Sequence, residues 1–258
     1  MFHFDSAIVR SPSRSVVAGL RAVERQVPIY ERIVAEHSAY VIALEAAGLD
    51  VEVLPALEAF PDSVFVEDPA LVFAEGAVVL RPGAPSRACE GAELAPTLEN
   101  RFERVIALPA GHVDGGDVLV TPDRIYIGLS LRTDALGARS LASILEGLGR
   151  TATIVPTPPG VLHLKSAAAL IDEETVLVTE TLAASGLFES MRRVLTPRGE
   201  EQGANALRLN GVVLVGAAFL RTIDLLTGRG MSVVPLAVSE VGKLDAGLSC
   251  LSLRWKRG

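Results

Sequence analysis

Short apolar runs alternate along the chain with polar turns, and four times two such runs flank a single turn. The paired runs span residues 70–80, 117–128, 167–178 and 206–215. Each pair has the length and turn composition of a β-hairpin, and the Asn210-Gly211 turn gives the strongest signal because both residues tolerate a positive φ. The pattern therefore predicts four hairpins spread over the chain.

A helix-like stretch follows each hairpin and leads to another apolar run. In residues 134–149, apolar side chains recur near helical spacing, Asp134 is placed to cap the start, and Gly149 is placed to end the helix. The apolar runs that follow the helices stop at five prolines: Pro55, Pro109, Pro156, Pro197 and Pro235. Proline has no N–H to donate to a β-ladder, so we expect each of these prolines to end a central strand.

The repeating unit is therefore strand, strand, helix, strand, and its fifth copy is divided between the termini. The C-terminal run 249–255 must borrow residues 6–10, a helix over 28–47 and a strand over 51–55. We expect an α/β fold, a five-bladed α/β-propeller of ββαβ units with pseudo-fivefold symmetry, whose closure removes exposed sheet edges. A doubly wound sheet would explain the alternation of strands and helices but not the hairpins.

Composition favours one soluble globular domain over residues 1–258. The chain is 49% hydrophobic, and no linker-like segment or charge run divides it. No signal-peptide pattern begins it, and the longest apolar run, 211–220, is too short to cross a membrane. Two cysteines 161 positions apart show no disulfide or zinc spacing, which favours a reducing cytoplasm. The formal charge of −7 argues against a nucleic-acid surface and favours a small cationic partner. We expect a monomer or a homodimer.

The loops that follow four of the prolines hold most of the residues capable of difficult chemistry. Cys250 lies on the loop side of its apolar run, where an isolated cysteine is usually a buried structural thiol. A histidine and several acids stand at corresponding loop positions of other units, and this favours Cys250 as a nucleophile. The rival thiol, Cys89, has no histidine in its loop, so we interpret it as structural.

Four histidines compete for the role of proton carrier. His3 lies near the terminus and His37 inside a helix pattern, where a surface or packed histidine is the ordinary explanation. His163 and Asp114 occupy matching positions in the loops of successive units, 49 residues apart. A carboxylate beside an imidazole fixes its tautomer and stabilises its protonated form, so we interpret His163 as the general acid/base and Asp114 as its partner. His112 is the substitute if Asp114 turns away.

Acidic residues in the loops predict a cationic ligand. The sequence 114–117, DGGD, could be only a tight turn, and no third acid or histidine stands at a spacing that completes a metal site, so we expect no metal. Asp62, Glu67 and Asp68 are interleaved with Phe65, which indicates a partly buried stretch whose carboxylates need cationic partners. A planar guanidinium, permanently charged and rich in donors, matches such a pocket.

Five motifs in order resemble the dimethylarginine dimethylaminohydrolase family of the guanidine-modifying pentein superfamily. They are FPDSVFVEDP, RPGAPSR, GLSLRT, VLHLK and KLDAGLSC, and they extend over almost the full length. The resemblance implies a fivefold α/β-propeller. It also implies hydrolysis of asymmetric dimethylarginine or monomethylarginine to citrulline and dimethylamine or methylamine, through a covalent thiouronium on cysteine. It implies no metal or organic cofactor.

By this resemblance Cys250 is the nucleophile, His163 the general acid/base and Asp114 its orienting acid. The resemblance also implies the substrate-binding residues: Leu20 in a lid, Asp62 for the α-amino group, Phe65, Glu67 and Asp68 around the guanidinium, Arg87 and Arg132 for the α-carboxylate, and Ser249 beside the nucleophile. Some bacterial relatives carry Glu where Asp114 stands, so its reach is shorter here. The N-terminal loop matches less well than the other motifs.

Two further classes of function stay open at this stage. Arginine deiminases and amidinotransferases use similar Cys-His-acid chemistry, but they are longer chains with insertions absent here. The ribosome anti-association factor is a non-catalytic propeller, and the joint presence of Cys250, His163 and the acids argues against that class. A panel of methylated and unmethylated arginines would separate the enzymes.

Overall fold

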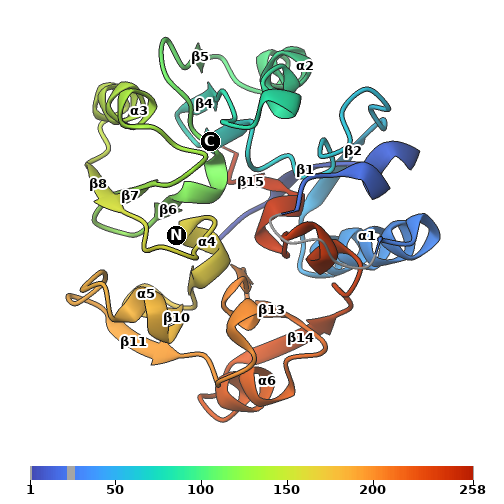
Figure 1. Ribbon diagram of the computed structural model, residues 1–258, viewed down its shortest axis with the longest axis vertical. Helices are drawn as coiled ribbons and strands as arrows, with labels where there is room; N and C mark the ends of the chain where they lie inside the picture. The colour runs from blue at the N-terminus through green and yellow to red at the C-terminus, as the bar shows by residue number, and fades with distance from the viewer. Residues whose placement is uncertain (1, 22–26, 258) are drawn as a thin grey trace.

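The computed structural model describes residues 2–21 and 27–257, which form five three-stranded sheets around a common centre (Figure 1). Every sheet pairs two strands antiparallel, as a hairpin in four of the sheets, and adds a third strand parallel to the middle one. This confirms the five ββαβ units expected from the repeating pattern. The four hairpins appear at the expected places, and Asn210 in the last of them has a positive φ of 46°.

The strands, in spatial order within each sheet, are β15 (Leu253–Trp255), β1 (Ser6–Arg10) and β2 (Asp50–Leu54); β3 (Ala70–Phe73), β4 (Gly76–Val79) and β5 (Val105–Ala107); β6 (Val118–Val120), β7 (Ile125–Leu129) and β8 (Ala152–Pro156); β9 (Ala168–Leu170), β10 (Thr175–Val178) and β11 (Arg192–Leu195); β12 (Leu207–Leu209), β13 (Val212–Gly216) and β14 (Ser232–Leu236). The α-helices are α1 (Tyr30–Ala46), α2 (Glu90–Glu99), α3 (Ala135–Gly147), α4 (Leu164–Ala167), α5 (Glu180–Ala183) and α6 (Leu220–Thr227).

The split unit closes the ring as expected. Strand β15 pairs antiparallel with β1, where Ser6 lies opposite Trp255, and β1 pairs in parallel with β2 after the crossover through α1. Phe102 of the neighbouring unit packs on Trp255, with ring centroids 5.1 Å apart. Buried aromatic contacts of this kind join one unit to the next, and each buried large side chain stabilises the fold by about 1.5–3 kcal/mol.

The prolines lie at or just after strand ends, as expected, but these strands are edge strands and not central ones. Pro156 is the last residue of β8 and Pro235 the next-to-last residue of β14, and each of these strands is at an edge of its sheet. The missing N–H of a proline does no harm at an edge, because one side of an edge strand has no ladder partner. The middle strands β10 and β13 are instead almost wholly buried.

Helix α3 begins and ends close to the residues that the sequence indicated. The Asp134 side chain accepts a hydrogen bond of 2.7 Å from the Gly137 N–H, which caps the first turn, and Gly149 has a φ of 75° just after the helix. Leu141 and Leu145 are fully buried and hold the helix on its sheet. The periodicity and the capping residues of this segment therefore determine where α3 begins and ends.

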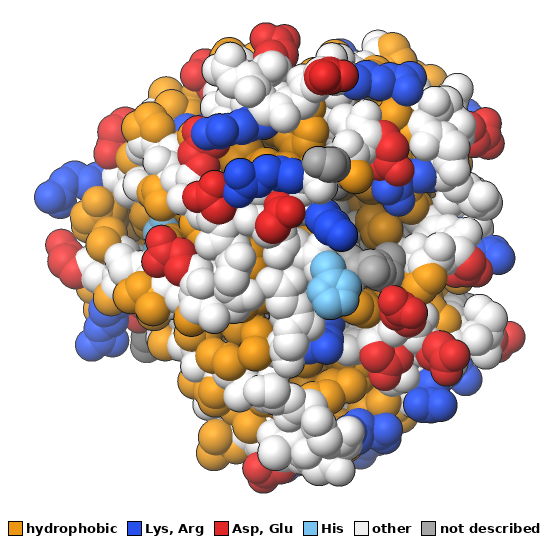
Figure 2. Space-filling model, turned by 180° about the vertical axis from the view of Figure 1, so that it is seen from behind, with side chains coloured by type: hydrophobic (Ala, Val, Ile, Leu, Met, Phe, Trp, Pro, Cys, Tyr) orange, Lys and Arg blue, Asp and Glu red, His pale blue; other side chains and the backbone are white. Residues whose placement is uncertain are grey.

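The far face of the molecule carries acidic and basic side chains interspersed with hydrophobic and neutral ones (Figure 2). This mixture accompanies the formal charge of −7. Among the described helices, none combines the length and hydropathy that a membrane span requires.

Candidate active site

The loops after several sheets meet at a small cavity of about 40 Å³ that contains most of the expected site residues. Its lining residues are Leu20, Arg21, Asp62, Phe65, Asp68, Arg87, Asp114, Arg132, Leu162, His163, Leu244, Asp245, Ala246 and Cys250. Of the expected residues, Glu67 and Ser249 are outside this lining. The volume suits about one water molecule, and Leu20 and Arg21 of the N-terminal loop are part of its lining.

Cys250 lies in a short 3-10 turn, Ser249–Leu251, and is buried. Asn205, from the preceding unit, holds this turn, because its Oδ1 accepts a 3.0 Å hydrogen bond from the Ser249 N–H. The Asn205 Nδ2 then lies 3.9 Å from the Cys250 sulfur and is placed to donate to it. Gly247 packs flat against this amide, since a Cβ there would lie 2.4 Å from Asn205 Cγ. Sequence reasoning missed Asn205, because a single neutral amide in a loop gives no pattern.

His163 and Asp114 meet as expected. The His163 Nε2 lies 3.2 Å from the Asp114 Oδ2, while the Asp114 Oδ1 accepts a 2.7 Å hydrogen bond from the Gly83 N–H. Asp114 is fully buried, and each of its two carboxylate oxygens has a partner, His163 for one and the Gly83 N–H for the other. His112 is half exposed and pairs with Asp134 at 3.1 Å, away from the cavity. The substitute role considered for His112 has no support in this arrangement.

The charges around the two reacting groups favour a protonated imidazole and a neutral thiol. Burial alone would lower the pKa of His163, but the hydrogen bond that its ring donates to Asp114 and the negative charges of Asp68, Asp117 and Asp114 outweigh it and raise that pKa to about 9. Burial, reinforced by Asp68 and Glu67, raises the pKa of Cys250 to about 11.

Lys165, in α4, opposes this rise in the pKa of Cys250. Sequence reasoning gave Lys165 no part in the site. Lys165 follows His163 by two residues in the motif VLHLK, and this spacing in a short helix was the signal that sequence reasoning passed over.

The two glycines of DGGD are required by close contacts. A Cβ on Gly115 would lie 1.9 Å from the Glu67 carbonyl oxygen. A Cβ on Gly116 would lie 2.7 Å from the His163 Nδ1 and 3.0 Å from the Asp68 Oδ1. The interpretation of this motif as only a tight turn was incomplete, because the absent side chains leave room for the imidazole and the acids.

Arg87 is buried and connects the acidic loop to α2. Its Nη1 donates to the Asp68 Oδ2 at 2.5 Å, and its Nε and Nη2 donate to Glu90, the first residue of α2, at distances down to 2.7 Å. The Nη2 also donates to the carbonyl oxygens of Asp62 and Phe65. Arg87 therefore orders the loop, and one Nη1 hydrogen is left for a ligand. Glu90 was missed because nothing in its helix pattern distinguished it from a surface acid.

Asp62 and Arg132 both line the cavity. The Asp62 Oδ1 accepts a 3.0 Å hydrogen bond from the Leu20 N–H, and burial raises the pKa of Asp62 against the opposing charge of Arg87. Arg132 is half-buried, and its guanidinium has no hydrogen-bonded acceptor among the described residues. Arg132 thus has guanidinium donors available for an anionic group in the cavity.

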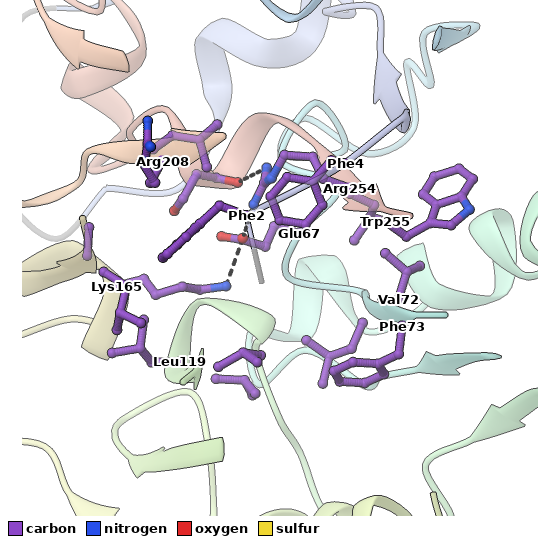
Figure 3. Close-up of a pocket in the computed structure, with 18 of the residues that line it drawn as sticks. Phe2, Phe4, Glu67, Val72, Phe73, Leu119, Lys165, Arg208, Arg254 and Trp255 are labelled. Atoms are coloured by element: carbon purple, nitrogen blue, oxygen red, sulfur yellow. Dashed lines mark hydrogen bonds and ion pairs between the residues drawn. The ribbon is translucent and has the colours of Figure 1, made fainter. Parts of the chain in front are cut away.

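Glu67 and Ser249 lie behind the cavity, in the wall of a central channel of about 670 Å³. The Glu67 Oε1 contacts the Lys165 Nζ at 2.7 Å and the Arg254 Nη2 at 3.1 Å, as the dashed lines in Figure 3 show. Asp68 and Cys250, their immediate neighbours in sequence, face the small cavity. The wall between the two spaces is therefore one residue thick, and Glu67 is held by two cations of its own.

The cavity groups three possible metal-binding side chains whose sequence spacing did not indicate a site. Ligand atoms of Asp68, Asp114 and His163 all lie within 4.8 Å of one another. The Asp68 oxygens accept from Arg87 and from the Gly116 N–H, and the Asp114 oxygens are bonded as described above. The arrangement thus already contains two cationic partners, a guanidinium and an imidazole.

Comparison with known protein families and solved structures gives matches over most of the chain. The family model described as N,N dimethylarginine dimethylhydrolase, eukaryotic, matches residues 21–182. The N(G),N(G)-dimethylarginine dimethylaminohydrolase of Pseudomonas aeruginosa is 36% identical over 256 residues, which cover 98% of this chain and all of that protein. The protein of the same name from Streptomyces coelicolor is 38% identical and covers 96% of each chain.

Solved structures resemble the whole chain as well. A cysteine-to-serine variant of the Pseudomonas aeruginosa protein, in complex with citrulline, superposes with a TM-score of 0.95 and covers 98% of this chain and all of that one. The N-terminal domain of ArgZ, a cyanobacterial arginine dihydrolase, superposes with a TM-score of 0.87 at 17% identity and covers 98% of each chain, a likeness of fold alone.

Proposed function

The chain belongs to the dimethylarginine dimethylaminohydrolase family, and we propose that the cavity around Cys250, His163 and Asp114 is its catalytic centre. The protein is a hydrolase of C–N bonds that converts methylated arginines to citrulline and an amine. The observation that carries the residue assignment is the convergence of a buried thiol, an imidazole of raised pKa and a group of acids on one small cavity.

The substrate is held by complementary charges at its two ends. Asp68 and Asp114 place negative charge beside the guanidinium, and Arg132, which has donors to spare, binds the α-carboxylate. Asp62 lies where it accepts from the α-amino group. Arg87 acts mainly by holding Asp68 and the loop of Asp62 in place. Glu67 acts from the other side of the wall between the two spaces. It pairs with Lys165, and its negative charge raises the pKa of Cys250.

The first half of the reaction transfers the carbon to sulfur. As the cationic substrate binds, Cys250 releases its proton to solvent, and its sulfur attacks the guanidinium carbon to form a tetrahedral adduct. His163, protonated at neutral pH, donates its proton to the substituted nitrogen, because an amine leaves readily only in protonated form. The C–N bond breaks, dimethylamine or methylamine departs, and a covalent thiouronium remains on Cys250.

The second half of the reaction hydrolyses this intermediate. His163 is now neutral and takes a proton from a water molecule, whose oxygen attacks the thiouronium carbon. The hydroxyl proton of this second adduct passes to the sulfur as the C–S bond breaks, so citrulline leaves, Cys250 is a thiol again and His163 keeps the proton it took from water. Asp114 stabilises the imidazolium at each protonated stage, since its Oδ2 stays 3.2 Å from the ring.

Separate cysteine substitutions test the assignment. We expect Cys250→Ser to abolish citrulline formation from dimethylarginine, whereas Cys89→Ser, at an exposed thiol, retains nearly all of it. Citrulline release should be measured with dimethylarginine, monomethylarginine and arginine side by side. Turnover by Cys250→Ser comparable with that of the wild type would refute the nucleophile assignment. Faster turnover of arginine than of either methylated substrate would move the chain to the deiminase class.

A further inference from the structure

Asp117 is a fully buried carboxylate that the reaction described above does not use. Its Oδ2 accepts hydrogen bonds from the Ser130 hydroxyl at 2.6 Å and the Thr133 hydroxyl at 2.7 Å. Its Oδ1 accepts from the Leu164 N–H at 3.2 Å, at the start of α4 and directly after His163. Three donors from two separate segments therefore meet on one side chain.

The two hydroxyls belong to the turn that presents Arg132. The Ser130 Oγ also accepts from the N–H groups of Arg132 and Thr133, at 2.9 and 3.2 Å, so the carboxylate and the turn are locked together. The Thr133 Oγ1 also accepts a 3.2 Å hydrogen bond from the Asp114 N–H. One network of hydrogen bonds thus fixes the backbone at Arg132, at Asp114 and just after His163.

The carboxylate also contributes to the charge around the imidazole. The ionisable groups that face His163 are Asp68, Asp114, Asp117 and Cys250, and the three acids all favour its protonated form. Burial raises the pKa of Asp117, whereas the charge of His163 and the two hydroxyl donors act to keep it ionised. The sequence placed Asp117 in the DGGD motif without giving it a part in the chemistry.

We propose that Asp117 is a positioning residue that sets the distance between the carboxylate-binding Arg132 and the proton carrier His163 and adds negative charge beside the imidazole. The proposal rests on the proposed roles of Arg132 and His163. A single carboxylate then links the two ends of the substrate site, so its loss acts on substrate binding and on proton transfer together. A residue that served folding alone would leave the titration of His163 unchanged.

The test uses Asp117→Asn, which removes the charge and keeps the size. In a Cys250→Ser background, the four histidine rings are followed by NMR against pH, and a His163→Gly variant assigns the His163 signal. We expect the pKa of His163 to fall by about one unit relative to the same protein with Asp117 intact, because one of three nearby acids has lost its charge. The matched control is Asp123→Asn, at an exposed acid in the β6–β7 turn, which should leave this pKa in place.

Steady-state kinetics with Cys250 intact give the second measurement. Asp117→Asn should lower kcat and raise KM for dimethylarginine about tenfold, and Ser130→Ala should raise KM with a smaller effect on kcat. An unchanged pKa of His163 together with an unchanged KM would overturn the proposal. If Asp117→Asn does not fold, as judged by circular dichroism, Ser130→Ala decides: an unchanged KM overturns the proposal and a raised KM supports it. The titration needs no turnover, so it can succeed even if the proposed reaction fails.

Discussion

At the scale of single residues, the site separates the protonation states that its chemistry needs. The pKa of the Cys250 thiol, about 11, leaves it neutral at pH 7, and the pKa of His163, about 9, leaves the imidazole charged. The acids that hold a cationic substrate are the same groups that oppose the thiolate. A bound guanidinium offsets those acids with its own fixed charge, so the substrate helps to activate its attacker.

This offset predicts a thiolate that appears on binding. We expect the ultraviolet absorbance of the thiolate to titrate far above pH 7 in the free enzyme. A non-reactive guanidinium analogue should move the titration down by one or more units, each worth about 1.4 kcal/mol. Cys250→Ser supplies the background spectrum. A thiolate that titrates below neutrality and is unmoved by the analogue would show that His163 activates the cysteine unaided.

The pKa of His163 sets the alkaline limb of the pH profile of kcat. His163 must carry a proton to release the amine, so kcat should hold below the pKa of about 9 and fall as the pH rises through it.

At the scale of elements, the 3-10 turn Gly115–Asp117 is the segment on which the site depends most. Gly115 in this turn leaves space for the Glu67 carbonyl and Gly116 leaves space for the His163 ring. The turn lies between Asp114 and β6. Neither glycine has a positive φ, so the constraint is space and not backbone conformation. A small turn between two acids therefore determines how closely the imidazole approaches the acids.

We expect Gly116→Ala to lower kcat by about a hundredfold, because its Cβ would displace the His163 ring by a fraction of an ångström to an ångström. The matched control is Gly147→Ala at the end of α3, where a Cβ meets nothing within 4 Å. Both proteins should be compared by citrulline release and by thermal unfolding. Equal activity of the two variants would contradict a steric role for Gly116.

At the scale of the whole molecule, the split fifth unit ties the two termini into one ring. We propose that residues 1–258 fold as a single domain, since hydrophobic clusters extend across neighbouring units, as between β1 and α2. Thermal unfolding should then show one transition, with the same midpoint by circular dichroism and by the fluorescence of Trp255, the single tryptophan of the chain. Two separated transitions would show that the split unit melts independently.

The sequence by itself determined the elements and their order. Hairpins, helix α3 with its cap, and the divided fifth unit follow from periodicity, turn residues and caps, which act over a few positions. Sequence reasoning also selected Cys250, His163 and Asp114, which the structure brings to one cavity, because repeated units place matching positions around one centre.

Only the tertiary structure decided which cavity each neighbouring residue faces. Glu67 and Asp68 point to different spaces, Asn205 reaches Cys250 from the preceding unit, and Asp117 joins two loops. These placements depend on contacts between segments far apart in the chain. The order of the strands within each sheet, which puts the prolines at sheet edges, depends on such contacts as well. The local sequence pattern therefore determines which helices and strands form, whereas close packing between the units determines which groups each side chain contacts.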